Sequence, residues 1–199
     1  MRTLAQGLVM VAVGLTLASC SPKTPGSAST APSVPSSRTN GAAVDVPQVE
    51  APLEVTRFEQ DPCAVLSQDQ ASQLANLTTT DKGPGATDLP ICGWRDGSRN
   101  TISFGFVRGN GLRDPYQNHA PGDPGYFEVA PAIAGYPAVF SDISDGRADG
   151  SCTLIVGVRN DEVLTVMSTL PRSSPHLKNA CQLVQKAAEA AIATIKGAK

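Results

Sequence analysis

The sequence is poor in histidine and in charged residues, and both shortages narrow the functions that it can serve. Only 17% of its 199 residues are charged, and the net charge is −2. A chain without a basic excess has no electrostatic footprint for nucleic acid, so nucleic-acid binding is excluded. The two histidines, His119 and His176, do not neighbour a serine in a GxSxG-type elbow. A nucleophilic triad is therefore not indicated.

Metal-binding patterns are also lacking. None of the five cysteines forms a CxxC pair, which together with the two histidines argues against a zinc site. The acidic stretch 142–150 fails as an EF-hand loop, because Gly146 falls at loop position five and Thr153 at position twelve. The sequence thus predicts no metal and no cofactor.

The N-terminus lacks an apolar run long enough to span a bilayer comfortably, which takes about 20 residues. Instead, a short positive start is followed by the uncharged stretch 7–18. This length is typical of the apolar region of a signal peptide, so we expect residues 1–19 to be a signal peptide. An uncleaved N-terminal membrane anchor is the alternative.

The stretch Leu17-Ala18-Ser19-Cys20 resembles the bacterial lipobox. Small residues before the cysteine suit the peptidase, and the free thiol of Cys20 can take a diacylglyceryl group as a thioether. A further acyl chain, such as palmitate, can then join the new amino terminus. Two or three chains hold a protein firmly on a membrane. We therefore expect a lipoprotein anchored through Cys20 to the extracytoplasmic face of the cell membrane.

The count of cysteines supports this assignment. Setting Cys20 aside leaves an even number, and exported proteins form disulfides in their oxidising compartment. Two disulfides are therefore expected among Cys63, Cys92, Cys152 and Cys181.

Residues 20–54 are expected to form a lipidated N-terminus and a disordered tether. This stretch is rich in Ser, Thr, Pro and Ala and has too few large apolar residues to form a core. The folded domain is expected to span residues 55–199.

The domain is predicted to be α+β, with about five antiparallel strands and helices on one face. A capping box at Ser67 and Gln70 predicts a short helix over 68–75. Two apolar runs joined by Asn160-Asp161 predict a hairpin. Apolar spacings of three and four predict a long C-terminal helix that faces the core and ends at Gly197.

The positions of the cysteines suggest a pairing, although four cysteines allow three connectivities. Cys63 and Cys181 each lie near the start of a helix, whereas Cys92 and Cys152 each begin a strand. We therefore expect the bridges Cys63–Cys181 and Cys92–Cys152.

Two groups of residues are candidates for function. An aromatic and basic loop carries Arg113, Tyr116 and Tyr126 and is a candidate contact surface; the alternative is that its tyrosines fix the loop to the sheet. A hydrolase of envelope polymers would instead need paired carboxylates, for which the candidates are Asp96, Asp114, Asp123 and Glu128.

Several motifs, in order, resemble the actinobacterial lipoproteins of the family of domain of unknown function 3558. They are Asp61-Pro62-Cys63-Ala64-Val65-Leu66, Cys92-Gly93-Trp94, Gly135-Tyr136-Pro137-Ala138, Cys152 at the head of a strand, and Cys181 in an alanine-rich final helix. The resemblance implies an envelope lipoprotein with an α+β core, and it implies no activity and no catalytic residues.

These observations together predict that the protein is not an enzyme. We expect a binding or accessory module whose partner is an envelope protein or a small-molecule ligand. The rivals are the envelope-polymer hydrolase and a purely structural surface protein.

Overall fold

The computed structural model describes residues 45–198. The predicted signal peptide, Cys20 and the tether up to residue 44 lie outside the described residues. In chain order the elements are α1 Thr56–Gln60, η1 Pro62–Val65, α2 Gln68–Ala75, β1 Thr79–Pro84, β2 Pro90–Arg95, β3 Thr101–Arg108, α3 Arg113–Gln117, β4 Tyr126–Ile133, β5 Tyr136–Asp142, η2 Arg147–Asp149, β6 Ser151–Arg159, β7 Glu162–Thr169, η3 Leu177–Asn179 and α4 Ala180–Gly197.

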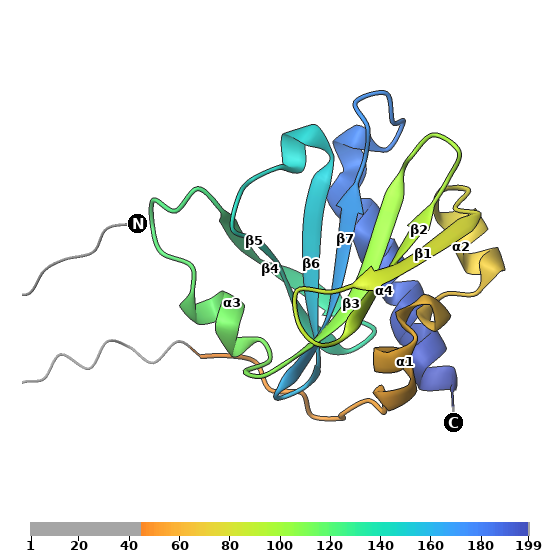
Figure 1. Ribbon diagram of the computed structural model, residues 1–199. Helices are drawn as coiled ribbons and strands as arrows, with labels where there is room; N and C mark the ends of the chain where they lie inside the picture. Colours follow the sequence, from red (N-terminus) through yellow and green to blue (C-terminus); the bar gives the residue numbers. More distant parts are fainter. Residues whose placement is uncertain (1–44, 199) are drawn as a thin grey trace, which may run out of the picture. The chain divides into compact units, whose positions relative to one another are not determined.

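The strands form one antiparallel sheet in the order β1-β2-β3-β7-β6-β5-β4, which confirms the α+β class (Figure 1). The sheet has seven strands, not about five. The strands missed include β1 and β4, the two edges of the sheet. Side chains of β1 are largely exposed, and β4 carries Pro131 and a register shift between Ala130 and Ile133. Edge strands of this kind lack the regular apolar alternation that identifies a strand in a sequence.

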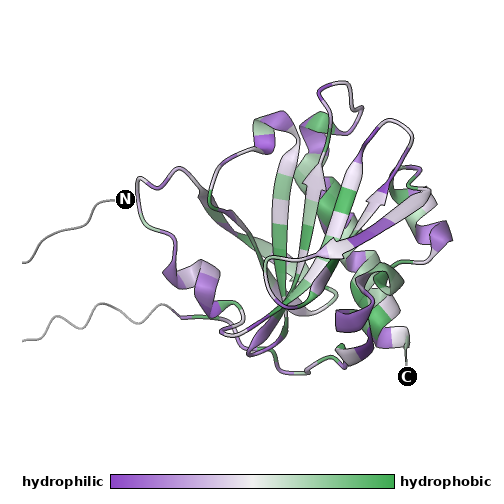
Figure 2. Cartoon of the chain, viewed as in Figure 1, coloured by the Kyte–Doolittle hydropathy of each residue, from purple (hydrophilic) through white to green (hydrophobic). Residues whose placement is uncertain are grey.

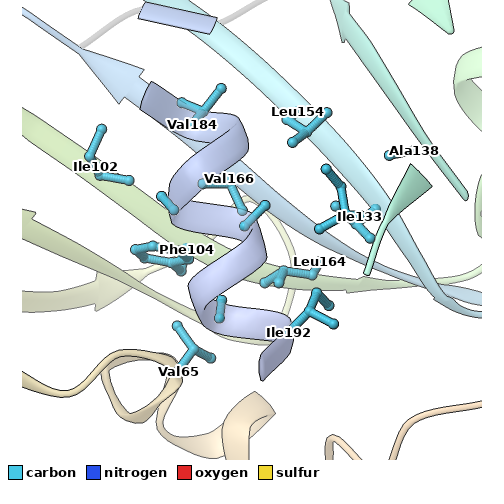
Figure 3. Packing of buried hydrophobic residues seen from close by; sticks show 14 of the residues in the cluster. Val65, Ile102, Phe104, Ile133, Ala138, Leu154, Leu164, Val166, Val184 and Ile192 are labelled. Carbon is cyan, nitrogen blue, oxygen red and sulfur yellow. The ribbon is translucent and has the colours of Figure 1, made fainter. Parts of the chain in front are cut away.

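The long helix α4 packs on one face of the sheet, which we call the helix face, and lies behind the strands in Figure 1. Figure 3 shows Val184 and Ile192 on this helix among Phe104, Leu164 and Val166 of the sheet. Its fully buried alanines let the helix approach the strands closely; they are Ala187, Ala188 and Ala191. The long core-facing helix was predicted correctly.

The N-terminal elements follow the predicted capping signal. The Ser67 hydroxyl accepts a hydrogen bond from the backbone N–H of Gln70, and the Gln70 side-chain oxygen accepts one from the backbone N–H of Ser67. The helix α2 therefore begins where predicted. Asn76 ends this helix in the left-handed conformation, with φ 52°.

The folded unit begins earlier than residue 55, where the tether was expected to end. Val49 and Leu53 are buried in the core. The Val49 amide donates to the Asn160 side chain, and the Leu53 amide donates to the Val158 carbonyl. The segment 45–54 was assigned to the tether because its apolar residues are isolated in sequence, whereas here Val49 and Leu53 are buried beside the β6–β7 hairpin.

Two disulfides are present, as expected, but the predicted pairing is wrong. The bridges are Cys63–Cys92 and Cys152–Cys181, with Cα atoms 5.1 and 5.2 Å apart. The prediction paired helix with helix and strand with strand. In the structure η1 lies on β2, and the start of α4 lies near the start of β6, so each helical cysteine meets the strand beneath it.

Candidate functional site

The face of the sheet opposite α4, the open face, is only partly covered. Strands β3, β7 and β6 place alternate residues on it, and these are half-buried side chains of small or moderate size. They are Ser103, Val107, Thr165, Met167 and Ile155. Figure 2 shows apolar residues along these central strands and hydrophilic residues on α3 and many loops.

Two adjoining hollows lie on this face and share Ala86, Val107 and Met167. Their volumes are about 690 and 240 Å³. We call them together the open-face groove. The floor is apolar, and the shared residues make the two hollows continuous.

One wall of the groove is built by α3 and the loop after it, and three packing contacts hold this wall. Leu112 is buried with Val139 of β5. The Tyr116 ring meets Phe127 edge-on, with centroids 4.8 Å apart, and the His119 ring stacks on the same Phe127 at 5.7 Å. The ring contacts hold the wall to β4, while Leu112 also packs with Val163 of β7 near the hairpin turn. Farther along the central strands, Ile155 and Met167 stay half-buried.

The opposite wall is the turn between β1 and β2, residues 85–89. The Gly85 amide donates to the Leu89 carbonyl and closes this turn. Next to it, the Ile91 side chain lies over Gly105, where a Cβ atom would come within 2.9 Å of Ile91 Cγ2. Glycine at position 105 therefore keeps room on the floor for Ile91.

The larger hollow carries negative charge on its wall. Asp114, Asp123 and Asp142 line it, and among its lining residues within the described range there is no lysine or arginine. Each carboxylate is oriented by a donor: the Asn110 amide for Asp114, the Ala120 N–H for Asp123, and the Thr153 hydroxyl for Asp142. The groove thus combines an apolar floor with acidic groups at one end.

The structure does not bring the predicted contact residues onto one surface. Arg113 lines a small hollow beside Val49 and Asn160, away from the groove. Tyr116 fixes α3 to the sheet, which is the alternative role considered for it. Tyr126 is a core residue, 6% exposed, whose hydroxyl accepts a hydrogen bond from the Thr153 amide. Tyr126 was taken for a loop residue because the strand that begins there was not recognised.

The four candidate acids separate into different places. Asp96 caps the β2–β3 turn through Ser98 and Asn100, and Glu128 pairs with Arg147 on the surface at 3.6 Å. Only Asp114 and Asp123 share the groove.

Sequence reasoning missed a buried acidic pair at one end of the sheet. Glu59 of α1 and Glu162 of β7 are 1% and 2% exposed. Glu59 accepts a hydrogen bond from Arg108, which lowers its pKa. Burial, and then the neighbouring Glu59, raise the pKa of Glu162 to about 7, against the opposing effect of Arg159 at 3.3 Å. Glutamate beside a hairpin turn normally points to solvent, so no sequence signal identified this pair.

Two other kinds of site were sought in the part of the chain that the structure describes. Residues 45–198 hold no cluster of three or more His, Cys, Asp or Glu side chains suited to a metal ion. Within the same residues no helix is sufficiently long and apolar to cross a membrane.

The chain belongs to the family described as "Protein of unknown function (DUF3558)", whose model matches residues 15–194. No curated protein and no solved structure matches it.

Proposed function

We propose that this family member is a lipid-anchored extracytoplasmic binding module, and that the open-face groove holds a small ligand. The observation that carries the proposal is the groove itself. An antiparallel sheet commonly has one solvated face, but that face is then polar. Here the central strands instead present Val107, Ile155 and Met167 at the floor of a walled hollow.

The construction of the walls supports a persistent site. The α3 wall is held by buried Leu112 and by the rings of Tyr116 and Phe127. The groove is therefore formed before any ligand binds, so little conformational entropy has to be lost on binding.

Binding of a neutral apolar dye such as Nile red tests the groove. Full-length protein carrying Cys20→Ala and purified without detergent is expected to bind the dye at one saturable site. Met167→Lys places a charge on the floor and should weaken binding about tenfold or more, as expected for burying a charge or losing an apolar contact. Val129→Lys is the matched control, because Val129 is an apolar β-strand residue that is already 61% exposed and lies outside the groove. Equal loss in both variants, or no saturable binding, would reject the groove as a binding site.

The proposed anchor rests on the lipobox-like Leu17-Ala18-Ser19-Cys20 and the tether that follows it. Cys20→Ala removes the thiol that would carry the diacylglyceryl group. In the native host, the variant is expected to leave the detergent-soluble membrane fraction, whereas Ser21→Ala should stay in it. Fractionation with immunoblotting measures this, and unchanged retention of Cys20→Ala would refute lipid anchoring.

One observation favours the second candidate function, an envelope-polymer hydrolase. Asp114 and Asp123 lie in the same hollow, as paired carboxylates of a glycosidase must. If they hydrolyse a polymer, either Asp114→Asn or Asp123→Asn should abolish release of soluble fragments from purified envelope. A structural surface protein is the third possibility, and it predicts neither dye binding nor hydrolysis.

A further inference from the structure

We propose that the ligand of the open-face groove is an amphiphile with an extended apolar chain and a cationic head group. This inference rests on the proposed binding function and adds the chemistry of the ligand. It follows from the division of the groove into an uncharged part and an acidic part.

The smaller hollow is built for the chain. No charged residue lines it in the described structure, and its side chains include Leu89, Ile91, Val107 and Met167. Ser103, Gly105 and Thr165 are small and keep its floor low. A hydrocarbon chain gains from contact with such a surface, whereas a charged group would lose its hydration there without a partner.

The larger hollow is suited to the head group. Asp114, Asp123 and Asp142 stand on its wall without lysine or arginine beside them among the described lining residues, and His119 is the other ionisable side chain there. The hydrogen bonds to Asn110, Ala120 and Thr153 fix the carboxylates and leave further acceptor positions on their oxygens. Three carboxylates attract a cation and repel an anionic head group.

The length of the groove favours an elongated ligand. Ile91 and Ile143 are two of the three large apolar side chains that are exposed among residues 45–198, at 37% and 88%, and each lines a different hollow. Ile91 belongs to β2 and Ile143 directly follows β5, with β3, β7 and β6 between these two strands. Four strand spacings of about 4.8 Å give about 19 Å. An extended chain can contact apolar residues along this path, which a compact ligand cannot.

Three probes with the same dodecyl chain test the inference by isothermal titration calorimetry below their micelle concentrations. They are dodecyltrimethylammonium, dodecyl maltoside and dodecyl sulfate, and the protein is the full chain with Cys20→Ala. The cationic probe is expected to bind at least about tenfold more tightly than the neutral one, as two or three exposed ion pairs together allow. The anionic probe should bind most weakly, and added salt should reduce the difference.

Three variants test which residues cause these effects. Asp114→Asn/Asp123→Asn keeps the shapes and the accepting oxygens but removes two of the three charges, so it should reduce the preference for the cation to about threefold or less while the neutral probe still binds. Glu50→Gln/Glu189→Gln removes the same charge outside the groove and should leave the preference intact. Thr165→Phe fills the floor and should weaken all three probes.

The outcomes separate the inference from the proposed function. Binding of all three probes with equal affinity, lost in Thr165→Phe, would overturn the cationic amphiphile and keep the binding groove. If none of the three probes binds and the neutral dye does not bind either, both the inference and the proposed binding function are rejected. A dimer that Thr165→Phe dissociates would assign the groove to a second copy of the chain and overturn the proposal.

Discussion

Replacing both cysteines of the Cys152–Cys181 bridge with alanine is expected to lower the free energy of unfolding by about 3.5 kcal/mol. The bridge closes a loop with a sequence separation of 29, and the chain-entropy model gives this value for such a loop. It joins the start of β6 to the start of α4, the helix that covers the core. Urea unfolding followed by circular dichroism measures the change, and a loss below about 1 kcal/mol would contradict it.

The same cysteines provide a direct test of connectivity. In a protein that already carries Cys20→Ala, the change Cys152→Ala should leave one free thiol in denaturant, and alkylation followed by mass spectrometry should place it at Cys181. The matched variant Cys63→Ala should expose Cys92 instead, because its bridge has the same sequence separation. Alkylation at Cys63 or Cys92 in the Cys152→Ala protein would disprove the pairing seen here.

The second large effect is a fall in stability as pH rises. The pKa of Glu162 is raised by burial and by Glu59, from 4.5 to about 7. A carboxyl with a raised pKa binds its proton more tightly when folded, so its contribution is complete below pH 4.5 and is lost as pH rises to about 7. One unit of pKa corresponds to about 1.4 kcal/mol of stability. Because Glu162 and Glu59 titrate as an interacting pair, only part of the full shift is assigned to Glu162. Between these limits we therefore expect the free energy of unfolding to decrease by about 2 kcal/mol.

The variant Glu162→Gln isolates this effect. It keeps the shape of the side chain and removes the titration, so the slope between pH 4.5 and 7.5 should flatten, and the variant should exceed the wild type in stability at pH 7.5. The contribution of Glu59 depends on pH in the opposite sense, because its pKa is lowered in the folded state. This contribution stabilises the fold above the ordinary pKa of glutamate and is lost on acidification. Glu189→Gln, at an exposed position of α4, should leave the profile unchanged. An unaltered slope in Glu162→Gln would refute the assignment.

Local signals in the sequence predicted those elements that local interactions stabilise. The capping box at Ser67 and Gln70 is satisfied within four residues, and the Asn160-Asp161 turn joins strands that pair with each other. The periodicity of α4 reports one continuous apolar stripe. In each case the residues that determine the structure are close in sequence.

The disulfide pairing and the groove depend on long-range placement and could not be predicted in this way. Choosing a partner for Cys63 requires knowing that η1 lies on β2 and not beside Cys181 at the start of α4. The groove draws on residues from positions 85 to 167, and each of them, taken alone, is an ordinary strand or turn residue. Its acidic end is likewise invisible in sequence, because Asp114 of α3 and Asp142 of β5 come from separate segments that only the folded sheet brings to one hollow.

The contact of residues 49–54 with the β6–β7 hairpin has a mechanical consequence. A force that enters the domain from its N-terminal side reaches Val49 and Leu53 first, and their hydrogen bonds pass it to Asn160 and Val158. The Arg159 side chain also donates a hydrogen bond to the Leu53 carbonyl, which strengthens this connection. The strand that receives the load is therefore β6, which lies between β7 and β5 in the sheet. A pull from a surface would act on the interior of the sheet, where several rows of bonds must break together, and not on an edge strand that could be peeled away one bond at a time.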